Sequence, residues 1–115
     1  TSVCTGALML GAAGVLTGLP ATTHWYCHAE LARHGAIPTD ERVVFAGKVA
    51  TAAGVSAGID LALALNARIA GDDYAQMTQL DMEYDPQPPF RAGHPSVAPP
   101  ELVAQVRGMY DAMLG

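Results

Sequence analysis

Short strand-like runs alternate with helix-like runs along this chain, and that alternation limits the fold more than any other feature. Strands are predicted at residues 1–4, 21–24, 42–45 and 49–52, the last two being joined by a tight turn. Helices are predicted at residues 6–16, 25–34, 56–70, 73–83 and 100–114, with a proline-rich irregular segment over residues 85–100. Such alternation is typical of α/β proteins, in which helices cover a mostly parallel sheet.

The predicted boundaries depend on glycine, proline and small polar residues. Gly18 and Pro20 are expected to end the helix at residues 6–16, and Gly35 to end the helix at residues 25–34. Asp72 is expected to cap the helix that follows it. A doubly wound sheet usually has about five or more strands, so residues 1–115 are predicted to be the C-terminal portion of one domain whose first strands precede Thr1.

Composition excludes several classes of protein. Half of the residues (50%) are hydrophobic and 15% are charged, which suits a folded domain with a core. The net charge is −5 and the six basic residues are scattered, so nucleic acid is not an expected partner. Two cysteines do not make a disulfide scaffold, and they suit a reducing, cytoplasmic location. The apolar run at residues 49–70 is too interrupted for a membrane span, and the N-terminal run lacks the basic residues of a signal peptide.

Cys4 is the leading candidate for chemistry. A strand that runs through Cys4 and Thr5 directly into a helix resembles a nucleophile elbow, in which a reactive side chain is displayed on a sharp turn. The helix N-terminus favours a thiolate there, and the Thr5 N–H would face negative charge developing on a substrate. The alternative interpretation is a buried cysteine that packs as a small hydrophobic residue.

His24 lies at the end of a predicted strand, where α/β sheets place catalytic groups, so it is a candidate to orient or deprotonate Cys4. A structural histidine bonded to the backbone is the alternative. No metal site is expected, because His24 does not share a helical face with His28, and Cys27 and His34 fit ordinary packing or surface roles. The glycine-bearing run at residues 53–60 lacks the spacing of a phosphate-binding loop.

Four motifs then resemble one family in the order of its own motifs. They are SVCTGA at residues 2–7, ATTHW at 21–25, TAAGVSAGID at 51–60, and EYDPQPPF at 83–90 with GHP at 93–95. Together they resemble the ThiJ/PfpI superfamily, within the class I glutamine-amidotransferase-like fold, and its isonitrile hydratase-like subgroup. The resemblance implies a flavodoxin-like three-layer sandwich with a mostly parallel sheet, a homodimer, and no metal or organic cofactor.

The resemblance also implies a reaction on a small-molecule substrate. In isonitrile hydratase-like proteins the elbow cysteine, matched by Cys4, attacks the isonitrile carbon, and water releases an N-substituted formamide. Thr5 matches the hydroxyl residue beside it, and an acidic partner is expected upstream of Thr1. Two other functions remain open: the effector-sensing domain of an AraC-type regulator, and a stress protein that acts on reactive carbonyls or senses peroxide through Cys4.

Overall fold

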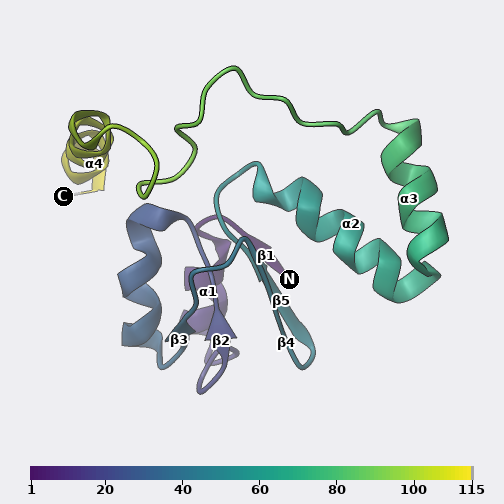
Figure 1. The fold of residues 1–115 in the computed structure, drawn as a ribbon. Coiled ribbons are helices and arrows are strands. Elements are labelled where there is room, and N and C mark those ends of the chain that lie inside the picture. The colour runs from purple at the N-terminus through teal and green to yellow at the C-terminus, as the bar shows by residue number, and fades with distance from the viewer. Residues whose placement is uncertain (115) are drawn as a thin grey trace. The chain divides into compact units, whose positions relative to one another are not determined.

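In the computed structural model, which describes residues 1–114, the chain divides into two units between Tyr84 and Asp85. The elements of the first unit are, in chain order, β1 (Ser2–Val3), α1 (Gly6–Ala12), β2 (Pro20–Ala21), the 3₁₀ helix η1 (Trp25–His34), β3 (Ile37–Pro38), β4 (Val43–Ala46), β5 (Val49–Ala52), α2 (Ala57–Ala70) and α3 (Asp72–Asp81) (Figure 1). The second unit contains α4 (Pro100–Leu114), which follows the irregular proline-rich segment as predicted.

Two small sheets organise the first unit. One has the strand order β1-β5-β4, in which β1 runs parallel to β5 and places Ser2 opposite Thr51. Strands β4 and β5 form an antiparallel hairpin, and Gly47 in its turn has a φ of 59°, which glycine adopts without strain. The second sheet pairs β2 with β3 in parallel, with Pro20 opposite Ile37. The predicted strands at residues 42–45 and 49–52 are confirmed, the first of them beginning one residue later than predicted.

Small and branched side chains fill two buried clusters. The first cluster joins α1, β2 and η1, and its buried members are Ala7, Leu16, Ala21, Leu31 and Ala36. The second joins β5 to α2, and its buried members are Ala50, Ala52, Ala57 and Leu61. Helix α2 therefore packs on the sheet through its first turns. The predicted helix at residues 56–70 is confirmed, with Ser56 at the N-cap position.

The predicted helix at residues 6–16 is wrong in its end point, because α1 ends at Ala12. Gly14 has a φ of 80° and donates its N–H to Gly11, while Val15 donates to Leu10. This pair of bonds is a Schellman motif, in which a left-handed glycine closes the last helical turn. Gly14 thus ends the helix before Gly18 or Pro20 is reached.

Three other local predictions differ from the structure. The strand expected at residues 21–24 is β2, which covers only Pro20–Ala21, because Thr22 donates its N–H to the Thr51 hydroxyl and not to a strand carbonyl. Its partner β3 was not predicted. The helix at residues 25–34 has the predicted bounds and ends at Gly35, but it is a 3₁₀ helix. Gly71, with a φ of 96°, occupies the N-cap position of α3, so Asp72 is the first residue of α3 and not its cap.

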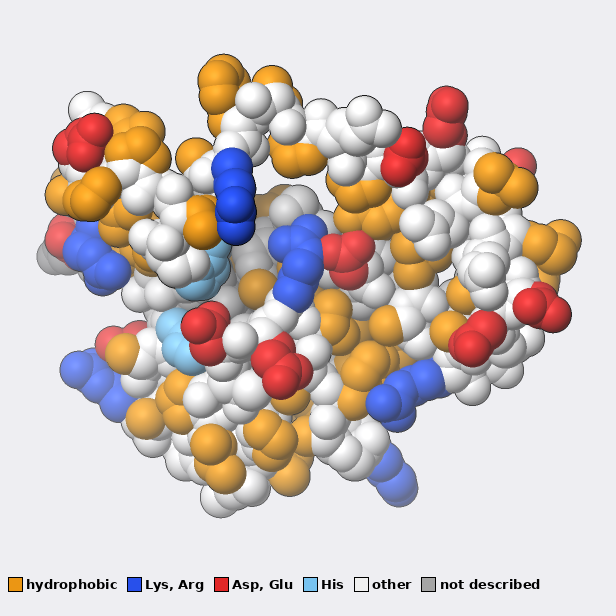
Figure 2. Space-filling model, viewed as in Figure 1, with side chains coloured by type: hydrophobic (Ala, Val, Ile, Leu, Met, Phe, Trp, Pro, Cys, Tyr) orange, Lys and Arg blue, Asp and Glu red, His pale blue; other side chains and the backbone are white. Residues whose placement is uncertain are grey.

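Large apolar side chains remain exposed on the α2–α3 hairpin. Figure 2 shows orange side chains over this part of the first unit. On α3 they recur with helical spacing at Tyr74, Met77 and Leu80, which are 55%, 66% and 81% exposed. Among residues 1–114, no helix is long and apolar enough to cross a membrane.

Candidate active site

Cys4 lies at the turn between β1 and α1, where the sequence predicts a nucleophile elbow. Its φ of 58° falls in the left-handed region, which costs a non-glycine residue about 1–3 kcal/mol. The Cys4 N–H is shared between the carbonyl oxygens of Ala52, at 3.2 Å, and Ala53, at 2.8 Å. The residue is only partly buried. The end of β5 therefore holds Cys4 in a strained conformation from which its side chain remains accessible.

Thr5 follows at the N-cap position of α1, with backbone angles in the helical region. Its side chain makes no capping hydrogen bond, and the residue is exposed. The first turn of α1 carries no acidic side chain within the described residues 6–12. The turn thus places a thiol and a hydroxyl next to each other at the beginning of α1.

The segment after β2 packs against the Cys4 turn. Thr23 donates its hydroxyl to the Cys4 carbonyl oxygen at 2.6 Å, across 19 residues of sequence. Thr22 and Thr23 are both 1% exposed, and the Thr22 N–H bonds to the Thr51 hydroxyl at 2.9 Å. Three of the motifs singled out in the sequence therefore meet here. Each peptide group of Cys4 has a defined partner, the N–H on β5 and the carbonyl on Thr23.

His24 caps η1 with its ring. Its Nδ1 accepts the Tyr26 N–H at 3.3 Å, so this nitrogen is the acceptor and a neutral ring carries its proton on Nε2. Burial lowers the pKa of His24 below its ordinary value, so the ring is neutral at pH 7. A Cβ atom on Gly54 would come within 3.4 Å of the His24 ring, which places the ring against the loop between β5 and α2. His24 thus has a hydrogen bond to the backbone, at Nδ1.

Cys27 lies in the first part of η1 and is 7% exposed. Burial, and then the nearby Cys4 and Glu30, raise the pKa of the Cys27 thiol, so it stays protonated at neutral pH. His28 Nε2 is 3.1 Å from the Thr39 carbonyl oxygen, and His34 lies against Gly11 of α1. These three residues act in packing and hydrogen bonding. Within residues 1–114, no group of three or more His, Cys, Asp and Glu side chains is placed to hold a metal ion.

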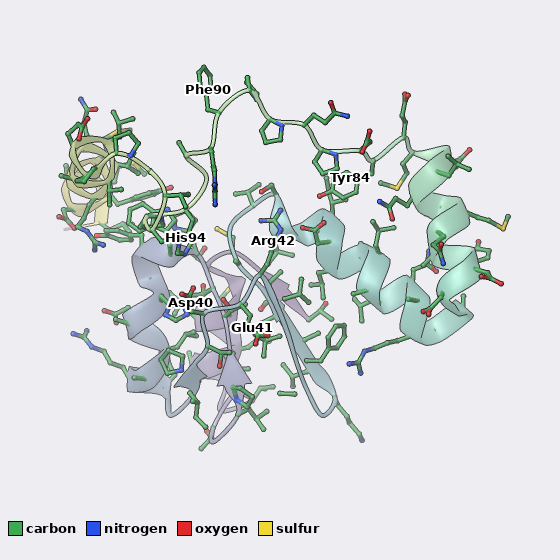
Figure 3. The ribbon with its side chains drawn as sticks, viewed as in Figure 1. Asp40, Glu41, Arg42, Tyr84, Phe90 and His94 are labelled. Atoms are coloured by element: carbon green, nitrogen blue, oxygen red, sulfur yellow. The ribbon has the colours of Figure 1, made fainter. Side chains whose placement is uncertain are left out.

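Sequence reasoning missed a polar cluster at the beginning of α2. Arg42, directly before β4, forms an ion pair with Asp60 on α2 and donates to the Ser56 hydroxyl at 3.3 Å. Tyr84 donates its hydroxyl to the other Asp60 oxygen at 2.7 Å. Figure 3 shows the Arg42 and Tyr84 side chains directed toward the same region at the beginning of α2. The sequence linked Asp60 only to the helix dipole, and no local pattern connects it to residues 18 and 24 positions away.

Asp60, Arg42 and Tyr84 each keep one protonation state around neutral pH. Burial opposes ionisation of Asp60, but hydrogen bonds from Arg42 and Tyr84 outweigh it and hold the pKa of Asp60 below its ordinary value. The hydrogen bond to Asp60 raises the pKa of Arg42. The hydrogen bond that Tyr84 itself makes to Asp60 raises the pKa of Tyr84, which remains a neutral donor. The cluster is therefore one cation, one anion and one neutral hydroxyl.

The sequence profile of the DJ-1/PfpI family matches residues 1–68, which include Cys4, Thr5, Thr23 and His24. The chain belongs to the DJ-1/PfpI family. A curated relative, isonitrile hydratase of Pseudomonas putida, is 52% identical over 107 residues, which are 93% of this chain and 47% of the relative.

Solved structures of the DJ-1/PfpI family show the same fold. The crystal structure of a ThiJ/PfpI family protein from Pseudomonas syringae is 47% identical, with a TM-score of 0.85 over 99% of this chain and 50% of that one. DJ-1 of Schizosaccharomyces pombe is 22% identical, with a TM-score of 0.64 over 72% of this chain and 43% of that one, and it shows the fold alone. The chain spans about half the length of these relatives. The predicted family and its flavodoxin-like α/β fold are confirmed.

Proposed function

We propose that the protein containing this chain is an isonitrile hydratase, a lyase that uses Cys4 as its nucleophile. The observation that carries the proposal is the position of Cys4. This residue occupies a strained and partly exposed turn in a chain that is 52% identical to an isonitrile hydratase over 107 residues. Strained residues cluster at active sites, where the surrounding structure holds a reactive group in place.

The proposed reaction adds one water molecule to the isonitrile. The Cys4 thiolate attacks the divalent terminal carbon, a C–S bond forms, and a proton completes the thioimidate R–N=CH–S. Water then adds to the same carbon with one of its hydrogens going to the nitrogen, and the tetrahedral intermediate collapses as the C–S bond breaks and the hydroxyl proton returns to the base left by the general acid. The products are the N-substituted formamide and the free thiolate. The first proton requires a general acid, which we place in the part of the relatives' length that this chain does not span.

We assign supporting roles to two further residues. The Thr5 N–H and hydroxyl lie beside Cys4 at the beginning of α1, where they are proposed to stabilise the sulfur and the charge that develops on the bound carbon. His24 is proposed to act as a neutral ring that orients the segment bonded to Cys4, because its Nδ1 already accepts the Tyr26 N–H. Deprotonation of Cys4 by that nitrogen is not part of the proposal.

The test is hydration of p-nitrophenyl isocyanide and cyclohexyl isocyanide by the intact protein. We expect Cys4→Ala to reduce turnover on the order of 10³-fold or more, and Thr5→Val to reduce it partially. Cys27→Ala is the matched cysteine control and should keep the wild-type rate. If the wild type consumes methylglyoxal but no isonitrile, the carbonyl-stress function replaces this proposal. If it consumes neither, a sensing domain is the better account.

We also propose that the protein is a cytoplasmic homodimer that acts on a small molecule. Both described cysteines are free, as suits a reducing compartment. The exposed apolar stripe of α3, formed by Tyr74, Met77 and Leu80, is of the kind that an interface covers. Light scattering of the intact protein at micromolar concentration should give a dimer mass, and Leu80→Glu should shift it toward the monomer. A wild-type monomer would contradict this proposal.

A further inference from the structure

Arg42 forms a hydrogen bond at each end of the loop between β5 and α2, which is residues 53–56. At the first end, the Arg42 carbonyl accepts the Ala53 N–H at 2.9 Å. At the other end, the guanidinium donates to the Ser56 hydroxyl at 3.3 Å and pairs with Asp60 one helical turn later. One residue before β4 therefore determines where residues 53–56 lie.

The same loop packs against the Cys4 turn. The Ala53 carbonyl accepts the Cys4 N–H at 2.8 Å, so residue Ala53 bonds to Arg42 through its N–H and to Cys4 through its carbonyl. Gly54 lies against the His24 ring, and a Cβ on Gly58 would come within 3.3 Å of the Val3 side chain. The loop thus touches the Cys4 backbone and the histidine that follows the Thr23 contact, and the first turn of α2 touches the residue before Cys4.

From these contacts we infer that Arg42 is a positioning residue for Cys4. A non-glycine residue keeps a φ of 58° only where its surroundings determine it strongly, and the Ala53 carbonyl is one of the groups that do so. The Arg42 carbonyl accepts the Ala53 N–H and the Arg42 guanidinium bonds to Ser56 at the other end of the loop, while Asp60, which accepts the Tyr84 hydroxyl, holds the guanidinium. This inference deepens the proposed function, because it rests on Cys4 being the nucleophile.

A second arginine provides a matched control. Arg68, near the end of α2, lies over the Phe45 ring of β4 with its guanidinium carbon 3.6 Å from the ring centre. Arg42 and Arg68 therefore both tie α2 to the same strand region. Only Arg42 also contacts the loop that bonds to Cys4. Comparing Arg42→Ala with Arg68→Ala separates general support of α2 from control of the Cys4 turn.

The experiment measures iodoacetamide labelling of Cys4 and Cys27 in the native, intact protein at pH 7, read by peptide mass spectrometry. We expect Arg42→Ala to slow labelling of Cys4 about tenfold while Cys27 is unchanged, and Arg68→Ala to leave Cys4 at the wild-type rate. Arg42→Lys, which keeps the charge but not the planar fork, should restore only part of the rate. In turnover, Arg42→Ala should lower kcat more than it raises KM.

If Arg42→Ala does not fold, Tyr84→Phe replaces it, because this change removes one hydroxyl from Asp60 and should slow Cys4 labelling two- to threefold. An unchanged or faster Cys4 rate in the folded variants overturns the inference, whatever their thermal stability. Labelling does not depend on the substrate. A slowed Cys4 in a protein that ignores isonitriles would therefore refute the hydratase proposal and leave Arg42 as a positioning residue.

Discussion

Cys4 and Cys27 are the same residue type in two contrasting regions of one unit. Cys4 lies in a left-handed turn, is partly exposed, and has its backbone bonded to Ala53 and Thr23. Cys27 lies within η1, is 7% exposed, and has a pKa raised first by burial. Small residues surround Cys4 in the sequence, whereas aromatic and histidine residues flank Cys27. The local backbone decides which thiol is partly exposed and which one packs as a hydrophobic group.

The largest expected difference between these two regions is in thiol reactivity. In the native protein at pH 7 we expect iodoacetamide to label Cys4 about 10–100-fold faster than Cys27, because Cys27 is buried and protonated and must wait for local opening. Peptide mass spectrometry over a labelling time course measures both rates in one sample. In concentrated urea the two rates should converge. Equal rates in the native state would remove the distinction between the two cysteines.

Substitution by glycine should change stability in opposite directions at the two sites. Cys4→Gly removes the Cβ that makes a φ of 58° costly, so we expect the free energy of unfolding to rise by about 0.5–1 kcal/mol. Cys27→Gly removes a buried side chain from a helix interior, so we expect a loss of about 2 kcal/mol. Urea unfolding followed by circular dichroism measures both. Destabilisation of similar size at both sites would show that the Cys4 turn is not strained.

The hydrogen bond from Thr23 to the Cys4 carbonyl gives a smaller effect that tests how the turn is held. Thr23→Val keeps the shape of a buried side chain but leaves the part-buried Cys4 carbonyl without its donor, which should cost about 1–1.5 kcal/mol. Thr39→Val is the control, since Thr39 also donates its hydroxyl to a backbone carbonyl, that of Ile37 at 2.9 Å, but at an exposed position. We expect the control to cost less than about 0.5 kcal/mol. Equal costs for the two variants would mean that the Cys4 turn does not depend on Thr23.

The parts of the fold that were predicted from sequence are those governed by local physics. Gly35 ends η1 in a left-handed conformation, and α2 and α4 follow their hydrophobic patterns. Where two local signals compete, the prediction fails. Gly14 closes α1 before Gly18 can, and both are glycines that adopt a positive φ. Strand β3 is only two residues long and contains a proline, so no alternating pattern marks it.

The candidate site also has a part that local sequence predicts and a part that it does not. The Cys4 turn is visible in sequence because strand, cysteine, glycine and helix follow one another within a few residues. The contact between Thr23 and Cys4 spans 19 residues, and the pair of Arg42 and Asp60 spans 18. Such contacts depend on the pairing of segments that are distant in sequence, as β5 pairs with β1, and no local pattern specifies that pairing. The strand-to-helix turn at Cys4 was therefore predictable, and the contacts that support it were not.

The smallest expected effect concerns His24, which belongs to both regions because it follows Thr23 and caps the helix that carries Cys27. Burial lowers the pKa of His24 in the folded protein, so the unfolded chain binds the proton more readily. Its contribution to stability is then complete above about pH 6.5 and is lost as the pH falls toward the folded pKa. Because the ring is only partly buried, we expect a loss of less than about 1 kcal/mol between pH 7 and pH 5.

His24→Asn is the variant that isolates this effect, because asparagine can still cap η1 but does not titrate. Urea unfolding at half-unit pH steps should show a shallower slope between pH 7 and pH 5 in the variant than in the wild type. Asp60 also has a lowered pKa, but its contribution is lost only below the unfolded value of about 3.9. The two titrations therefore occupy separate pH ranges, and Asp60→Asn should change the slope of stability against pH only in the lower range. An unchanged slope above pH 5 in His24→Asn would show that the buried ring does not couple folding to pH.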